Sequence, residues 1–179
     1  MKKIYAWIFR LAGWRTAIHA EILSKCVICV APHTSNWDFI WGMLLFKSIG
    51  GKPNVLMKKS WFVFPFNIIL KALGGVPVDR TKHSSLTEQL SEEFRQRSHF
   101  QLAIAPEGTR KKNPHWKSGF YYIAREAHVP ITLAYLDYAQ KIVGVLENFL
   151  PTGNVESDME RIKQMYKNIV GKKPAQFAI

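Results

Sequence analysis

Short apolar runs alternate along this chain with stretches of helical periodicity, and this alternation constrains the fold more than any other feature. The apolar, β-prone runs predict strands at 26–31, 54–58, 76–78, 100–105, 131–135 and 142–145. The intervening stretches predict helices at 37–48, 84–97, 119–127 and 158–170, with part of 61–73 helical after Pro65. Such alternation is typical of an α/β domain with helices on both faces of a sheet. The length suits one domain, which we expect to span residues 1–179.

The first 18 residues predict an amphipathic N-terminal helix, beginning near residue 3. Its apolar positions recur at steps of three and four residues: Ile4, Trp7, Ile8, Leu11, Trp14 and Ile18. The basic side chains around this stripe are Lys2, Lys3, Arg10 and Arg15. Two interpretations stay open. The helix packs on the surface of its own domain, or it lies in a membrane interface with tryptophan at the level of the headgroups.

Positive charge dominates the composition, with 25 Lys and Arg against 13 Asp and Glu and a formal net charge of +12. This charge predicts a polyanionic partner, such as nucleic acid, an anionic membrane or a phosphorylated substrate. Six tryptophans beside the basic residues favour a membrane surface. A membrane-spanning helix needs about 20 apolar residues, whereas the best uncharged aromatic and aliphatic run, 61–70, contains Pro65. We therefore expect a peripheral, monotopic protein.

The two cysteines, Cys26 and Cys29, lie within one predicted strand and should face opposite sides of the sheet. A zinc site would need two further ligands, and the sequence has no second C-x-x-C and no close pair of histidines. We expect two buried free thiols and no metal site. Free thiols indicate a reducing compartment, which would place the protein on the cytoplasmic face of a membrane.

The first candidate catalytic segment follows the predicted strand 26–31 and contains His33 and Asp38, separated by four residues. In open α/β sheets, ligands bind beyond the carboxyl ends of strands. A histidine held by a carboxylate can act as a general base near neutral pH. A structural alternative is open, because Ser35 and Asp38 also satisfy the spacing of a capping box at a helix start.

Two further segments could bind an anion. Gly-Gly-Val-Pro-Val-Asp-Arg occupies 74–80 and ends in Arg80, although it also reads as a turn, a short strand and a solvated ion pair. Pro-Glu-Gly-Thr-Arg occupies 106–110, directly after the predicted strand 100–105. There Gly108 would allow close backbone approach, Thr109 offers a hydroxyl, and Arg110 can bind two phosphate oxygens. The alternative is a helix start with an exposed arginine.

These blocks, followed by Val-Pro-Ile at 129–131, resemble the glycerolipid acyltransferase family over about 27–135. The resemblance implies a mixed-sheet, glycerol-3-phosphate acyltransferase-like fold and O-acyl transfer from acyl-CoA or acyl-carrier protein in phospholipid biosynthesis. It implies that His33 is the base and that Asp38 orients it. The residues that it implies for the acceptor phosphate are Arg80, Glu107, Gly108, Thr109 and Arg110, and Lys117 extends the same basic patch. The chemistry requires no metal and no cofactor.

The resemblance implies an acceptor like lysophosphatidic acid. Pro32 and Ala105 depart from the family's usual residues at those positions, where Asn and Phe are common, and leave open another lysolipid or a hydroxylated aminolipid as acceptor. A different class also accounts for the charge: a non-catalytic basic module that binds anionic membrane or nucleic acid. That class does not explain why the candidate residues each follow a predicted strand, and no nucleic-acid motif is visible, so we expect no nucleic-acid partner.

Overall fold

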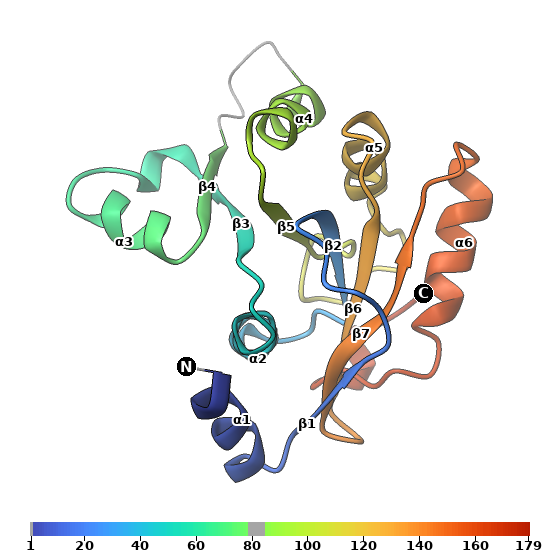
Figure 1. Ribbon diagram of the computed structural model, residues 1–179. Helices are drawn as coiled ribbons and strands as arrows, with labels where there is room; N and C mark the ends of the chain where they lie inside the picture. The colour runs from blue at the N-terminus through green and yellow to red at the C-terminus, as the bar shows by residue number, and fades with distance from the viewer. Residues whose placement is uncertain (1, 79–84) are drawn as a thin grey trace.

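A mixed sheet forms the centre of the protein in the computed structural model, which describes residues 2–78 and 85–179 (Figure 1). The strand order in the sheet is β1-β7-β6-β2-β5-β3-β4. The strand bounds are β1 (Arg15–Ile18), β2 (Lys25–Ala31), β3 (Pro53–Lys58), β4 (Gly75–Val78), β5 (Phe100–Ile104), β6 (Ile131–Asp137) and β7 (Ile142–Phe149). Every neighbouring pair is parallel except β6 and β7, which are antiparallel. The expected α/β fold with a mixed sheet is confirmed.

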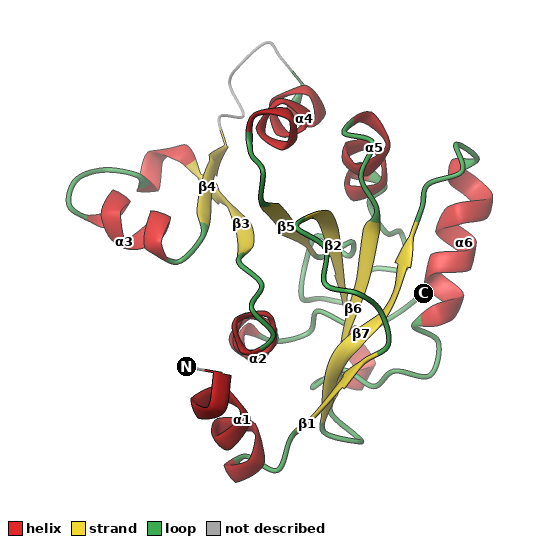
Figure 2. Cartoon of the chain, in the orientation of Figure 1, coloured by secondary structure: helices red, strands yellow, loops and turns green. Residues whose placement is uncertain are grey.

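Helices cover both faces of this sheet (Figure 2). They are α1 (Lys2–Leu11), α2 (Asn36–Ser48), α3 (Phe66–Ala72), α4 (Leu86–Gln96), α5 (Gly119–Glu126) and α6 (Val155–Met165), with 3₁₀ turns η1 (Lys59–Trp61) and η2 (Pro174–Gln176). α6 begins three residues earlier than expected, because the Asn154 side chain caps it by accepting from the Ser157 N–H at 3.2 Å.

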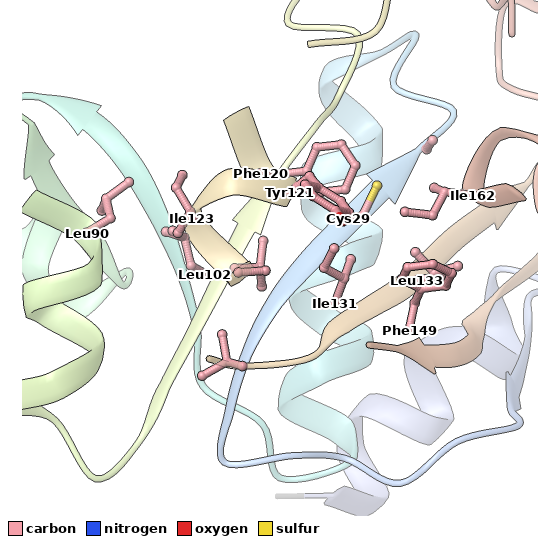
Figure 3. Packing of buried hydrophobic residues seen from close by; sticks show 14 of the residues in the cluster. Cys29, Leu90, Leu102, Phe120, Tyr121, Ile123, Ile131, Leu133, Phe149 and Ile162 are labelled. Carbon is pink, nitrogen blue, oxygen red and sulfur yellow. The ribbon is translucent and has the colours of Figure 1, made fainter. Parts of the chain in front are cut away.

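The core is divided by the sheet into two clusters, and β2 contributes to both. Cys29 packs with α4, α5 and α6 in the larger cluster, part of which Figure 3 shows around Tyr121 and Phe120. Cys26 packs in the second cluster with Phe9 of α1 and Phe46 of α2. The two thiols therefore face opposite sides of the sheet, as the strand period predicts. Burial raises the pKa of Cys26 to about 11, so this thiol stays protonated.

The N-terminal helix ends at Leu11, so the expectation of a helix through residue 18 is wrong. Gly13 adopts a φ of +71° and reverses the helical path. The next residues extend into β1 and pair in parallel with β7, from Arg15 opposite Ile142 to Ile18 opposite Val145. Pairing with a distant strand overrides the helical periodicity here.

α1 packs on the domain through Phe9, which is not part of the predicted apolar stripe. Phe9 is buried, whereas Ile4, Trp7 and Leu11 are 59%, 61% and 66% exposed. Three members of the predicted stripe therefore face outward, whereas Ile8 is half-buried and Trp14, beyond the helix, lies in the core. No helix among the described residues is long and apolar enough to cross a membrane.

A buried carboxylate, Asp158, joins the start of α6 to α5 and to the loop after β7. It accepts hydrogen bonds from the Tyr121 hydroxyl at 2.7 Å and from the Thr152 N–H at 2.7 Å. Burial alone would raise the pKa of Asp158, but these bonds outweigh it and lower the pKa below its ordinary value. The ionised form therefore stabilises the folded state.

We expect Asp158→Asn to lower the free energy of unfolding by about 2 kcal/mol at pH 7, because an amide cannot accept all of these bonds. A lowered pKa in the folded state contributes stability above about pH 4, and this contribution is lost as the pH falls below that value. The difference between wild type and variant should therefore shrink in acid. Urea unfolding at pH 7 and below pH 4 measures it. Glu160→Gln, an exposed carboxylate on the same helix, is the control and should change nothing. A deficit that is constant with pH would contradict the prediction.

Candidate active site

The carboxyl ends of three adjacent parallel strands meet at one edge of the sheet. β2 pairs with β5 on one side, where Cys29 lies opposite Ile104, and with β6 on the other, where Ala31 lies opposite Tyr135. The segments that follow these strands therefore start side by side. This pairing brings the two motifs at 33–38 and 106–110 together.

His33 and Asp38 face each other at this edge, with His33 Nδ1 3.4 Å from Asp38 Oδ2. Asp38 also completes a capping box at the start of α2. Its Oδ2 accepts from the Thr34 N–H at 2.7 Å and from the Ser35 N–H at 2.8 Å. The same carboxylate thus contacts His33 and caps the helix.

Asp38 is buried but remains charged. Burial would raise its pKa, whereas hydrogen bonds from His33, from Tyr138 and from two backbone N–H groups lower it below the ordinary value. The Tyr138 hydroxyl donates to Asp38 Oδ1 at 2.7 Å. Sequence reasoning missed Tyr138, which lies 100 residues away from Asp38; only the order of the strands could have indicated it.

Glu107 ties the second motif to the first. Its Oε1 accepts from the His33 backbone N–H at 2.8 Å, and its Oε2 is buried without a partner among the described residues. Burial raises the pKa of Glu107 above its ordinary value. Glu107 is only 2% exposed and is not one of the described residues that line the groove below. This placement differs from the expected contact with an acceptor and instead fixes the backbone of His33.

The remaining residues of the second motif form a basic rim. Gly108 has a φ of +64°, and a methyl group there would lie 2.9 Å from Lys117 Cε. The Lys117 side chain therefore crosses directly over Gly108. The Lys117 backbone N–H donates to the Pro106 carbonyl at 2.8 Å. Arg110 is exposed beside it. Arg80, expected in the same role, lies outside the described residues.

A groove of about 860 Å³ runs from this rim beneath α2. Its polar end contains His33, Asp38, Thr109 and Arg110. Its apolar walls come from α2, β3, β5 and β6, and include Phe39, Gly42, Met43, Phe46, Val55 and Leu136. The sequence did carry a signal for the α2 wall, because 37–46 is apolar on nearly every side of the helix.

The site can do proton-transfer chemistry at the end of an apolar channel. Asp38 holds Nδ1 of His33, so Nε2 is the nitrogen that remains for a substrate hydroxyl. Arginine and lysine at the rim can bind an anionic group. Among the residues that the structure describes, no group of three His, Cys, Asp or Glu side chains could hold a metal ion.

Comparisons with known proteins agree with this geometry. A family model described as Acyltransferase matches residues 15–135. No curated protein matches the sequence. Among solved structures, the chain is similar to the crystal structure of the 1-acyl-sn-glycerophosphate (LPA) acyltransferase PlsC from Thermotoga maritima, with 16% identity and a TM-score of 0.58 over 95% of this chain and 80% of that one. At this identity the likeness shows a shared fold. With the family model covering most of the chain, the protein belongs to the acyltransferase family.

Proposed function

We propose that the protein is an O-acyltransferase that moves a fatty acyl group from acyl-CoA or acyl-carrier protein to the hydroxyl of an acceptor like lysophosphatidic acid. The observation that carries the proposal is a histidine held by a buried carboxylate at the polar end of an apolar groove. A groove of this kind suits an acyl chain, and the histidine lies where the chain's carbonyl end would emerge.

In this mechanism His33 Nε2 removes the proton from the acceptor hydroxyl while the oxygen attacks the thioester carbonyl. The carbon–sulfur bond breaks, and the thiolate leaves and takes up the proton. An ester and a free thiol result, with no acyl-enzyme and no metal. Asp38 stabilises the imidazolium that forms during proton transfer.

The acceptor's phosphate would lie at the basic rim. Arg110 offers a planar guanidinium there, and Lys117 adds a second cation over Gly108. The similar Thermotoga maritima protein is described as an LPA acyltransferase, which supports an acceptor with a phosphate. We also propose that Arg80 binds this phosphate, on the basis of its sequence motif alone.

The protein would work at the surface of an anionic membrane, where lipid substrates reside. The exposed apolar residues of η1, α3 and the segment between them are Trp61, Val63, Phe64, Phe66, Ile68 and Ile69. Trp61 also lines the groove, so this surface continues into the site. Lys58 and Lys71 flank it and would attract anionic headgroups. In Figure 1, α1 and α3 lie on the side of the molecule away from α6.

We expect His33→Ala to lower the rate of acyl transfer by about 10²–10⁴-fold without unfolding the protein, because the general base is lost. Product analysis with a panel of lysolipids and both donor types measures transfer. His99→Ala, an exposed histidine after α4, is the control. A folded His33→Ala protein with more than about a tenth of wild-type activity would reject the role. Wild-type protein that transfers no acyl group, yet binds vesicles, would support the non-catalytic alternative.

Arg110→Lys keeps the charge but replaces two parallel hydrogen bonds with a point charge. We expect the KM for lysophosphatidic acid to rise at least about tenfold, and the KM for the acyl donor to change less. Steady-state kinetics with each substrate varied in turn gives both values. Arg125→Lys on α5 is the matched control. Equal shifts for donor and acceptor would reject the phosphate role and indicate an acceptor without a phosphate.

Charges placed in the exposed apolar surfaces should weaken membrane binding without unfolding the protein. We expect Trp7→Glu with Leu11→Glu, and separately Phe64→Glu with Ile68→Glu, to reduce partitioning to vesicles of phosphatidylglycerol and phosphatidylcholine at least about tenfold. Co-sedimentation measures this. Leu150→Glu, at a leucine that is 69% exposed after β7, is the control. Wild-type binding by both pairs would contradict membrane docking through these surfaces.

A further inference from the structure

The two oxygens of the Asp38 carboxylate have different partners. Oδ2 accepts from the Thr34 and Ser35 N–H groups at 2.7 and 2.8 Å, and it is the oxygen 3.4 Å from His33 Nδ1. Oδ1 accepts from the Tyr138 hydroxyl at 2.7 Å. Among the described residues, Tyr138 is the one partner recorded for Oδ1.

This division has a geometric consequence. The contacts on Oδ2 restrain the torsion of the carboxylate about its Cβ–Cγ bond from one side only. A bond to Oδ1 adds an independent restraint on the same torsion and so holds the plane more firmly. We propose that Tyr138 is a positioning residue for the His33–Asp38 pair, holding the carboxylate plane and taking up part of its charge so that His33 is oriented and can release its proton.

Tyr138 is itself held on three sides before any substrate binds. Its N–H donates to the Val170 carbonyl at 2.8 Å. Its ring meets that of Trp14 edge-on, with centroids 4.9 Å apart and an interplanar angle of 88°. The preceding residue, Asp137, fixes the turn by accepting from the Ala139 N–H at 2.9 Å. The hydroxyl is therefore preorganised toward Asp38, which is what an orienting group requires.

Tyr138 remains a neutral donor throughout the working range of pH. Burial raises the pKa of Tyr138 above its ordinary value, and the hydrogen bond to Asp38 raises it further. Among the described residues, Tyr138 donates to Asp38 and Glu107 interacts electrostatically with both members of the pair. Arg110 lines the same groove as the pair. When the tyrosine hydroxyl is removed, the Asp38 charge acts more strongly on the imidazole. His33 should then keep its proton to higher pH.

The inference rests on the proposed function and is tested with Tyr138→Phe, which removes the hydroxyl but keeps the ring against Trp14. We expect kcat to fall about tenfold, the KM for both substrates to stay unchanged, and the acid limb of the kcat/KM profile to move to higher pH. Tyr121→Phe is the matched control, because Tyr121 also donates to a buried aspartate, Asp158, at 2.7 Å. It should lower the melting temperature without changing kcat or the pH profile. Identical behaviour of the two variants would overturn the proposal.

A double-mutant cycle shows whether Tyr138 acts through Asp38. In an Asp38→Asn background, Tyr138→Phe should cause little further loss of kcat. Fully additive losses would overturn the positioning role.

A second measurement does not depend on activity. Nitrogen-15 shifts of the His33 imidazole, titrated from about pH 4 to about pH 9, should show a higher midpoint in Tyr138→Phe than in wild type or Tyr121→Phe. An unchanged midpoint with normal kcat would reject the Tyr138 proposal alone. Wild-type protein without acyl transfer would reject the proposed function, and the imidazole titration would still decide the role of Tyr138.

Discussion

The parallel pairing of β2 with both β5 and β6 is the constraint on which the site depends. Parallel strands bring their carboxyl ends to one edge, so segments that begin near residues 32, 105 and 138 start as neighbours. Hydrogen bonds then join them: Glu107 accepts from the His33 backbone N–H, and Asp38 accepts from the Tyr138 hydroxyl. The sheet brings the segments within reach, and the two carboxylates fix their relative positions.

The two buried carboxylates, Asp38 and Glu107, have pKa values that are shifted in opposite directions. Asp38 accepts from two backbone N–H groups at a helix start, from His33 and from Tyr138, and its pKa is lowered. Glu107 accepts from His33 at one oxygen while its other oxygen has no partner among the described residues, and its pKa is raised. Hydrogen bonding thus outweighs desolvation in the first case only. The hydrogen bonds with His33 and Tyr138, together with the two backbone N–H groups of the helix cap, keep Asp38 charged beside the histidine.

Local patterns could predict the strands other than β1, most of the helices and the facing of His33 and Asp38, because strand and helix periods and loop positions are local properties. The predictions failed where distant pairing decides. Arg15 lies in a strand because Ile142 is beside it, and Tyr138 reaches Asp38 because β6 lies next to β2. The sequence also did not predict that Glu107 accepts a hydrogen bond from the His33 backbone N–H. A motif gives the types of its residues but not the direction in which each side chain points.

The short strand β1 has a mechanical consequence for α1. Because β1 is hydrogen-bonded into the sheet directly after Gly13, and Phe9 is anchored in the core, α1 is a rigid projection and not a flexible tether. At the proposed lipid surface, the molecule would therefore sit at one tilt, with the mouth of its groove at a constant depth. Lipids would reach the groove by lateral diffusion within the leaflet, a search in two dimensions that needs no extraction of an acyl chain into water.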